Sequence, residues 1–291
     1  STAHRTLAAS QPALSGELLV QEEPLSAYAE KERSRTIGVV LTDKTQAGGL
    51  TVYELVALGR QPHTGFFGRL NKTDHSIIEE ALEAVSISHK AHSYTAELSD
   101  GERQKVMIAK ALVQECPLIL LDEPTAFLDF PSKVEMMQLL HQLSRQTDKT
   151  IFLSTHDLEL ALQIADKIWL MDKVNGVTIG TPEDLSLNGS LSNFFARKGI
   201  AFDLETGLFR VANEYTSQIR LAGHGQKYAM VRKALQRNGI LANRNVESEI
   251  YIETGDLKGD GSFVFHRPGK EPVTVYSIEK LLQIVLSFHS L

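Results

Sequence analysis

The sequence predicts an α/β protein with a mostly parallel sheet, followed by a small α+β domain. Over the first two thirds of the chain, short apolar runs alternate with stretches of helical periodicity. Such alternation is typical of parallel strands joined by helical crossovers. Near Thr206 the pattern changes, and short strands then dominate. The length of 291 residues allows one large domain with an appended module, or two ordinary domains.

The first part of the chain shows each expected element in turn. Short apolar runs indicate buried strands, and apolar residues three and four positions apart indicate helices. Ser99 with Glu102 three residues later forms a capping box, which marks the start of one of these helices. We expect strands at residues 36–41, 118–121, 150–154 and 168–171, and helices at 51–58, 75–85, 100–114, 134–143 and 158–165.

The second part combines strands and helices in a different order. We expect strands at residues 208–211, 218–221, 249–253, 262–266 and 273–276, with helices at 228–236 and 278–286. This mixture indicates an α+β sandwich of about 85 residues, a size that is reasonable for a separate domain. The predicted domains are therefore residues 1–204 and residues 205–291.

Composition favours a globular protein without a membrane span. Apolar residues make up 42% of the chain and charged residues 23%. The net charge of -6 argues against non-specific nucleic-acid binding. No run approaches the ~18 apolar residues of a spanning helix, and the first residues lack the apolar core of a secretion signal. The single cysteine, Cys116, is consistent with a reducing cytosol.

Two adjacent carboxylates and a histidine are the main candidates for chemistry. Asp122 and Glu123 end one apolar strand, and His156 follows the next. Ligand sites in open α/β sheets lie at the carboxyl ends of the strands. Hydrolysis of a nucleoside triphosphate needs a held magnesium ion and an oriented water. Asp122 would hold the metal directly or through its water, Glu123 would polarise the attacking water, and His156 would contact the γ-phosphate. The alternatives are an ordinary acidic strand end and a loop histidine.

A capped helix start and a nearby aspartate are further candidates. Ser99 and Gly101 open a helix whose free amide groups attract an anion, and Gly101 permits close backbone approach. Asp129 lies a few residues past the carboxylate pair and suits a subunit contact. Its alternative role is to cap the helix that begins near Pro131, and both roles are compatible.

Together these segments resemble the nucleotide-binding subunit of an ATP-binding cassette (ABC) transporter, built on a P-loop NTPase-like core. Residues 98–104 resemble the family's signature, with Asp100 where glycine is usual, and residues 118–123 resemble its Walker B strand. Residues 126–129 resemble the D-loop, and His156 resembles the switch histidine. The resemblance implies that two subunits enclose two ATP molecules head to tail. The residues implied to bind the cofactor in this way are Ser99, Gly101, Glu102 and Asp129.

One further segment narrows the resemblance to importers. Residues 50–63 are similar to a segment of importers of ferric siderophores, haem and cobalamin. The resemblance implies a helical subdomain at about residues 50–115 that meets the membrane partner. It also implies a homodimer, transmembrane permease subunits and, indirectly, a periplasmic solute-binding protein. The expected location is the cytoplasmic face of the inner membrane, as a peripheral subunit without nucleic acid.

The sequence departs from the family pattern at the phosphate-binding loop, which should read Gly-x-x-x-x-Gly-Lys-Ser-Thr. Ser1 and Thr2 resemble the end of that loop, so both are implied to bind nucleotide and Ser1 also magnesium. The lysine and glycines are absent, and we expect the chain as written to bind ATP poorly or not at all. Thr42 stands where a glutamine usually touches magnesium, with Gln46 as the alternative.

The resemblance predicts an ATPase that uses ATP and Mg²⁺ to drive uptake of an iron chelate, haem or cobalamin. Two alternatives remain open. One is a soluble cassette ATPase in translation or DNA repair, although such proteins usually carry a second cassette or a long coiled-coil insertion, which this sequence lacks. The other is a non-hydrolysing scaffold subunit without a working phosphate-binding loop.

Overall fold

The computed structural model describes residues 6–8, 11–13, 15–41, 49–65, 68–172, 174, 176–196, 200–203, 208–211, 215–255 and 261–289. The chain forms two compact units, Ser1–Ser190 and Leu191–Leu291. The predicted domain boundary after residue 204 falls within the second unit and stays a prediction. Among the described residues, no helix is both long and apolar enough to cross a bilayer.

A three-stranded parallel sheet is at the centre of the first unit, as the alternating pattern predicted. Its strands are β3 (Ile37–Val40), β4 (Leu118–Asp122) and β5 (Thr150–Ser154), with β4 in the middle. Ile119, Leu120 and Leu121 of β4 are almost completely buried. All three strands end at one edge because they are parallel, and Asp122 lies directly opposite Ser154. This register places the end of β4 beside the end of β5.

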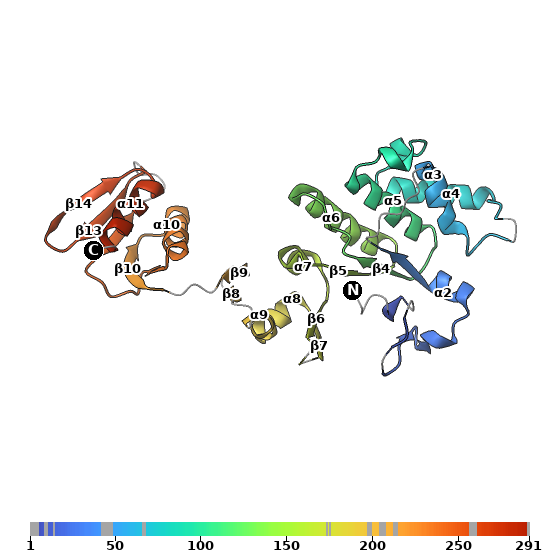
Figure 1. Ribbon diagram of the computed structural model, residues 1–291, viewed down its shortest axis with the longest axis horizontal. Helices are drawn as coiled ribbons and strands as arrows, with labels where there is room; N and C mark the ends of the chain where they lie inside the picture. The colour runs from blue at the N-terminus through green and yellow to red at the C-terminus, as the bar shows by residue number, and fades with distance from the viewer. Residues whose placement is uncertain are drawn as a thin grey trace. The chain divides into compact units, whose positions relative to one another are not determined.

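Helices precede or follow each strand of the parallel sheet. The helix α2 (Glu30–Thr36) precedes β3, α6 (Phe130–Gln146) follows β4, and α7 (Leu158–Ile164) follows β5 (Figure 1). A short hairpin of β1 (Leu19–Val20) and β2 (Glu23–Pro24) leads into the short helix η1 (Leu25–Ala27). The helix α6 begins four residues earlier than predicted, because Asp129 caps it and a proline occupies its first turn.

The helical subdomain predicted for residues 50–115 is a set of short helices packed on α5 (Asp100–Leu112) (Figure 1). Its other elements are α3 (Val52–Ala57), η2 (Leu58–Arg60), α4 (Lys72–Ala84), η3 (Ser88–Lys90) and η4 (Thr95–Glu97). Gly59 lies so close to α5 that a Cβ atom there would be 2.2 Å from the Lys110 carbonyl oxygen. Only glycine permits this approach without a shift of the backbone.

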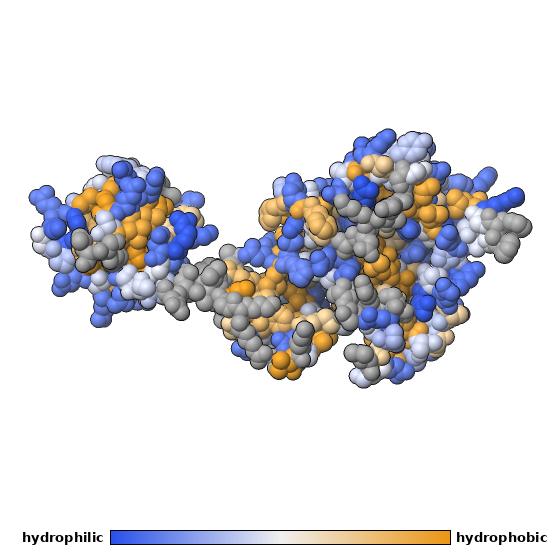
Figure 2. All heavy atoms as spheres, viewed as in Figure 1, coloured by the Kyte–Doolittle hydropathy of each residue, from blue (hydrophilic) through white to orange (hydrophobic). Residues whose placement is uncertain are grey.

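The strand predicted at residues 168–171 is present, and its pairing is antiparallel. The strand β6 (Ile168–Asp172) pairs antiparallel with β7 (Gly176–Gly180), and among the described residues it does not pair with the parallel sheet. The strand β7 was not predicted from the sequence, because its five mostly exposed residues contain no continuous apolar run. One face of the hairpin carries exposed apolar side chains: Trp169, Met171, Val177 and Ile179. Figure 2 shows hydrophobic surface in the region where Figure 1 places β6 and β7. The helices α8 (Pro182–Leu187) and α9 (Ser190–Ala196) follow.

The second unit contains a five-stranded sheet of order β11-β10-β12-β13-β14. The strands are β10 (Ser217–Ala222), β11 (Ile240–Asn243), β12 (Tyr251–Thr254), β13 (Phe263–Arg267) and β14 (Lys270–Val275). The helices α10 (Gly225–Arg237) and α11 (Ile278–His289) pack on this sheet and on each other (Figure 1). The predicted α+β class is therefore confirmed. The sequence reading missed β11, and the predicted strand at 208–211 is β9 (Leu208–Val211), which pairs instead with β8 (Ile200–Asp203).

Candidate functional site

The end of β4 and the end of β5 are joined by a serine hydroxyl. Ser154 Oγ donates a hydrogen bond to Asp122 Oδ1 over 2.7 Å and accepts one from the Glu123 backbone N–H over 3.1 Å. One hydroxyl therefore fixes both the Asp122 carboxylate and the first peptide beyond the strand. The sequence reading missed Ser154. The position of Ser154 at the end of the strand after β4 could have indicated a role at the sheet edge. The register that pairs Ser154 with Asp122 is known only from the fold.

The two predicted catalytic residues lie in contact at this edge. His156 Nε2 is 3.0 Å from Glu123 Oε1. Both side chains are accessible, with 87% of the His156 side chain and 40% of the Glu123 side chain exposed. Glu123 has a φ of 49°, in the left-handed region. A non-glycine residue there costs on the order of 1–3 kcal/mol, and such residues cluster at functional sites. The structure thus brings together two residues that are 33 positions apart in the sequence.

A second network ties the loops after β4 and β5 to α6. Asp157 accepts a hydrogen bond from Thr125 Oγ1 over 3.0 Å and from Lys133 Nζ over 3.1 Å. Thr125 is buried in the loop after β4, and Lys133 lies on α6. Asp157 directly follows His156, so these contacts hold the loop that carries the histidine. The sequence reading assigned no role to Asp157, Thr125 or Lys133, because their contacts depend on loops that are far apart along the chain.

The predicted capping box at the start of α5 is present. The Glu102 backbone N–H donates to Ser99 Oγ over 3.3 Å, and the Ser99 backbone N–H donates to Glu102 Oε2 over 2.9 Å. The hydrogen bond from the Ser99 backbone is the main reason that the pKa of Glu102 lies below its ordinary value, while burial opposes this shift. Lys90 Nζ lies 3.6 Å from the Glu102 carboxylate and supports the lowered pKa.

Gly101 is not required by packing within the chain. A Cβ atom at this position would meet only Leu128, at 3.9 Å, which is an ordinary van der Waals contact. Gly101 also adopts no positive φ. The chain's own fold therefore has room for a side chain here, in contrast to Gly59.

Asp129 caps α6, which confirms one of the two roles predicted for this residue. Its Oδ1 accepts a hydrogen bond from the Ser132 backbone N–H over 3.0 Å. Hydrogen bonds from Ser132, from its side chain first and then its backbone, lower the pKa of Asp129. Two exposed aromatic residues stand beside it: Phe127, with 81% of its surface exposed, and Phe130, with 69%. The predicted subunit contact of Asp129 stays a prediction.

The remaining predicted site residues lie outside the described part of the chain: Ser1, Thr2, Thr42 and Gln46. Within the described part, no group of three or more His, Cys, Asp or Glu side chains is placed to hold a metal ion. This arrangement still fits magnesium, which is usually bound by one or two carboxylates together with phosphate oxygens and waters. Asp122 and Glu123 supply such oxygen donors.

The parallel sheet, the carboxylate pair at its edge and the capped helix define the class of the protein as a nucleotide-binding α/β protein. Comparison with known families names the family. Residues 1–126 match the ABC transporter family, and residues 216–286 match the iron ABC transporter C-terminal domain. The chain belongs to the ABC transporter family as an ATP-binding protein. The resemblance and the fold class drawn from the sequence are therefore confirmed.

Similar proteins include several iron-related transport proteins. The chain is 35% identical over 213 residues to an uncharacterised ABC transporter ATP-binding protein of Methanocaldococcus jannaschii, covering 73% of each chain. It is 36% identical over 185 residues to the ferric enterobactin transport ATP-binding protein FepC of Escherichia coli, covering 64% of this chain and 68% of FepC. A solved putative metal-chelate type ABC transporter in an inward-facing conformation is similar at a TM-score of 0.58 and 28% identity, over 67% of this chain and 73% of that one.

Proposed function

We propose that the protein is the ATP-hydrolysing subunit of an importer, coupling ATP hydrolysis to the uptake of an iron chelate, haem or cobalamin. The contact between Glu123 and His156 at the sheet edge is the observation that carries the proposed hydrolysis. Among the three solutes, an iron chelate is favoured by the match of residues 216–286 to the iron ABC transporter C-terminal domain. The similarity to the ferric enterobactin protein also supports this choice.

The residues at the sheet edge divide the work of hydrolysis. Asp122 holds Mg²⁺, with one of its oxygens kept in place by the Ser154 hydroxyl. The metal ion, when bound, neutralises charge on the phosphate oxygens. Glu123 orients the attacking water and accepts its proton. His156 donates a hydrogen bond to the γ-phosphate, for which its exposed side chain must part from Glu123. Asp157 positions the histidine through Thr125 and Lys133.

A second copy of the chain completes the site in this proposal. The start of α5 offers free backbone amides and the positive end of a 13-residue helix, which suit the γ-phosphate bound to the other copy. Ser99 contacts that phosphate, Gly101 lets it approach, and Glu102 holds Ser99 in place. The absence of an internal need for glycine at position 101 supports this role. Asp129, with exposed aromatic neighbours, lies in the contact between the two copies.

The proposed assembly places the protein at the cytoplasmic face of the inner membrane as a peripheral subunit. Its helical subdomain meets a transmembrane permease, and a periplasmic solute-binding protein delivers the solute to that permease. ATP and Mg²⁺ are the cofactors, and closure of the dimer on ATP drives the transport cycle. No nucleic acid takes part in this proposal, which agrees with the net charge of -6.

The test is ATP turnover and ATP binding by the full-length protein. Glu123→Gln should lower kcat by at least about 100-fold while ATP still binds, because the proton acceptor is lost and the shape is kept. His156→Ala should lower kcat by a similar factor through loss of a donor to the γ-phosphate. Glu159→Gln, an exposed carboxylate on α7, is the matched control and should leave turnover unchanged.

Two results would contradict the proposal. Undiminished turnover by Glu123→Gln would show that another group acts on the water. A full-length protein that neither binds nor hydrolyses ATP would instead be the scaffold subunit considered from the sequence.

A further inference from the structure

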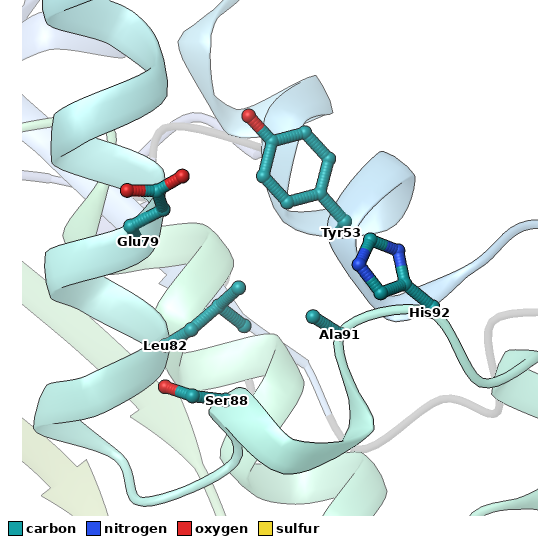
Figure 3. Close-up of a pocket in the computed structure, with 6 residues that line it drawn as sticks. All are labelled: Tyr53, Glu79, Leu82, Ser88, Ala91 and His92. Carbon is teal, nitrogen blue, oxygen red and sulfur yellow. The ribbon is translucent and has the colours of Figure 1, made fainter.

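A small cavity lies in the helical subdomain, between α3, α4 and the segment that begins at η3. Its volume is about 170 Å³. Figure 3 shows Glu79 and Leu82 of α4 on one side and Tyr53 of α3 on the other, with Ala91 and His92 beside Tyr53 and Ser88 at the end of the cavity near Leu82. A cavity of roughly 150 Å³ is large enough for a benzene molecule. This cavity therefore has room for one long side chain, but not for a helix or a nucleotide.

One wall of the cavity is apolar, and its rim is negatively charged. Leu82 is almost completely buried and forms part of the wall with Ala91. The Glu79 side chain is exposed and forms no ion pair with any described residue. Burial, and after it the negative charge of Glu79, raises the pKa of the Tyr53 phenol. The cavity thus offers an apolar passage that ends beside an uncompensated carboxylate.

The aromatic residue at this site is held in place. Tyr53 Oη lies 2.5 Å from His75 Nδ1, and the two rings are stacked with their centroids 6.2 Å apart. His75 and His92 are the titratable neighbours on the side of Tyr53, and Glu79 is the carboxylate on the opposite side. A fixed tyrosine ring attracts cations that approach its face.

An apolar stem with a cationic head matches this combination of groups. Lysine and arginine bury their methylene chains along apolar surface and keep the charged end in a polar environment. Cytoplasmic loops of membrane proteins carry an excess of these two residues. Two further exposed carboxylates, Glu80 and Glu83, lie on the same helix α4 but do not line the cavity. Charge complementarity therefore points to a basic side chain as the occupant, and the cytoplasmic loops of a membrane partner are rich in such side chains.

We infer that the cavity between Tyr53 and Glu79 receives one lysine or arginine side chain from a cytoplasmic loop of the membrane partner. This inference rests on the proposed function, which requires a permease to contact the helical subdomain. It adds the chemistry of the contact: Glu79 pairs with the cation, Tyr53 presents its ring to it, and Leu82 with Ala91 contacts the methylene stem.

The experiment is photo-crosslinking in membranes of cells that produce the protein. A benzophenone amino acid in place of His92 stands beside the cavity, and the cross-linked residue is identified by mass spectrometry. We expect a cross-link within a few residues of a lysine or arginine in a cytoplasmic loop of a multi-span membrane protein. Glu79→Gln should lower the yield about tenfold and Glu79→Lys should abolish it, because the pair is partly buried at the contact. Replacement of the partner's basic residue by glutamate should restore the yield of Glu79→Lys.

Glu83→Gln is the matched control, because this carboxylate lies on the same helix but does not line the cavity. Its yield should stay within about twofold of the unchanged protein, the range expected for an exposed charge. A cross-link to a soluble protein or to a second copy of the chain would overturn the inference. Equal yields for Glu79→Gln and Glu83→Gln on a membrane protein would overturn it as well, yet leave the proposed function intact. Failure of the proposed function would appear separately, in the ATP turnover of Glu123→Gln.

Discussion

The buried ion pair in the helical subdomain leads to a prediction about stability. Arg60 and Asp74 are 5% and 3% exposed, and Arg60 Nε donates to Asp74 Oδ1 over 2.9 Å. Arg60 Nη1 also donates to the Val113 carbonyl oxygen over 2.7 Å and lies 2.6 Å from Glu115 Oε2. The Glu115 side chain is 48% exposed. The two carboxylates around one guanidinium therefore differ sharply in burial.

Asp74→Asn should destabilise the first unit by about 3 kcal/mol, because it leaves a buried guanidinium without its buried counter-ion. Glu115→Gln should cost only about 0.2–1 kcal/mol, since water screens that pair. Urea unfolding followed by fluorescence gives both values, because the single tryptophan, Trp169, lies in the first unit. Equal losses for the two variants, or a loss below about 1 kcal/mol for Asp74→Asn, would refute the reasoning.

The same pair has a defined pH dependence. The pKa of Asp74 lies below its ordinary value, mainly because the Asn71 backbone N–H donates to the carboxylate; burial opposes the shift, and Arg60 adds to it. A carboxyl group with a lowered pKa in the folded state contributes stability above its unfolded pKa. This contribution should be fully present at neutral pH and should be lost as the pH falls below the unfolded value toward the lower folded value. Asp74→Asn should remove that part of the acid dependence.

Three further predictions concern packing and the sheet edge. Ser154→Ala should lower kcat about tenfold without unfolding the protein, because the carboxylate of Asp122 loses its 2.7 Å hydrogen bond. Ser154→Thr should restore part of the rate, and an unchanged kcat for Ser154→Ala would exclude a positioning role for Ser154. Gly59→Ala should destabilise the first unit by about 1–3 kcal/mol in urea unfolding, because the added Cβ overlaps a backbone oxygen of α5. Gly101→Ala should leave the free energy of unfolding unchanged and lower only ATP turnover, and equal losses of stability for the two variants would contradict this contrast. Cys116, just before β4, should react slowly with a thiol reagent at pH 8 until urea unfolds the protein, because burial raises the pKa of its thiol to about 11. Rapid labelling of the folded protein would contradict the burial of this thiol.

The candidate site was largely predictable because its residues follow strong local signals. An apolar run that ends in Asp122 and Glu123 identifies a buried strand and its carboxyl edge at once. The spacing of Ser99 and Glu102 identifies a helix start, and the structure has that capping box. His156 follows the next apolar run. Each signal involves residues within a few positions of one another, so the sequence displays it without knowledge of the fold.

The pairing of strands was less predictable. The exposed strand β7 has no apolar run, and the short β11 combines apolar and polar residues after a helix. Their partners are chosen by hydrogen bonds and side-chain contacts across the sheet, which the local pattern does not contain. The strand β6 pairs antiparallel with β7, and the alternating pattern, which indicated a mostly parallel sheet, contained no sign of this partner.

The sequence alone determined the class of fold, the family and the candidate residues Asp122, Glu123 and His156, because periodicity and short motifs are properties of neighbouring residues. Only the tertiary structure decided that Ser154 joins the ends of β4 and β5 and that Glu79, which forms no ion pair within the described part of the chain, lines the cavity beside Tyr53. These features arise where segments far apart in the chain meet. Their positions depend on register, burial and packing, which exist only once the chain has folded.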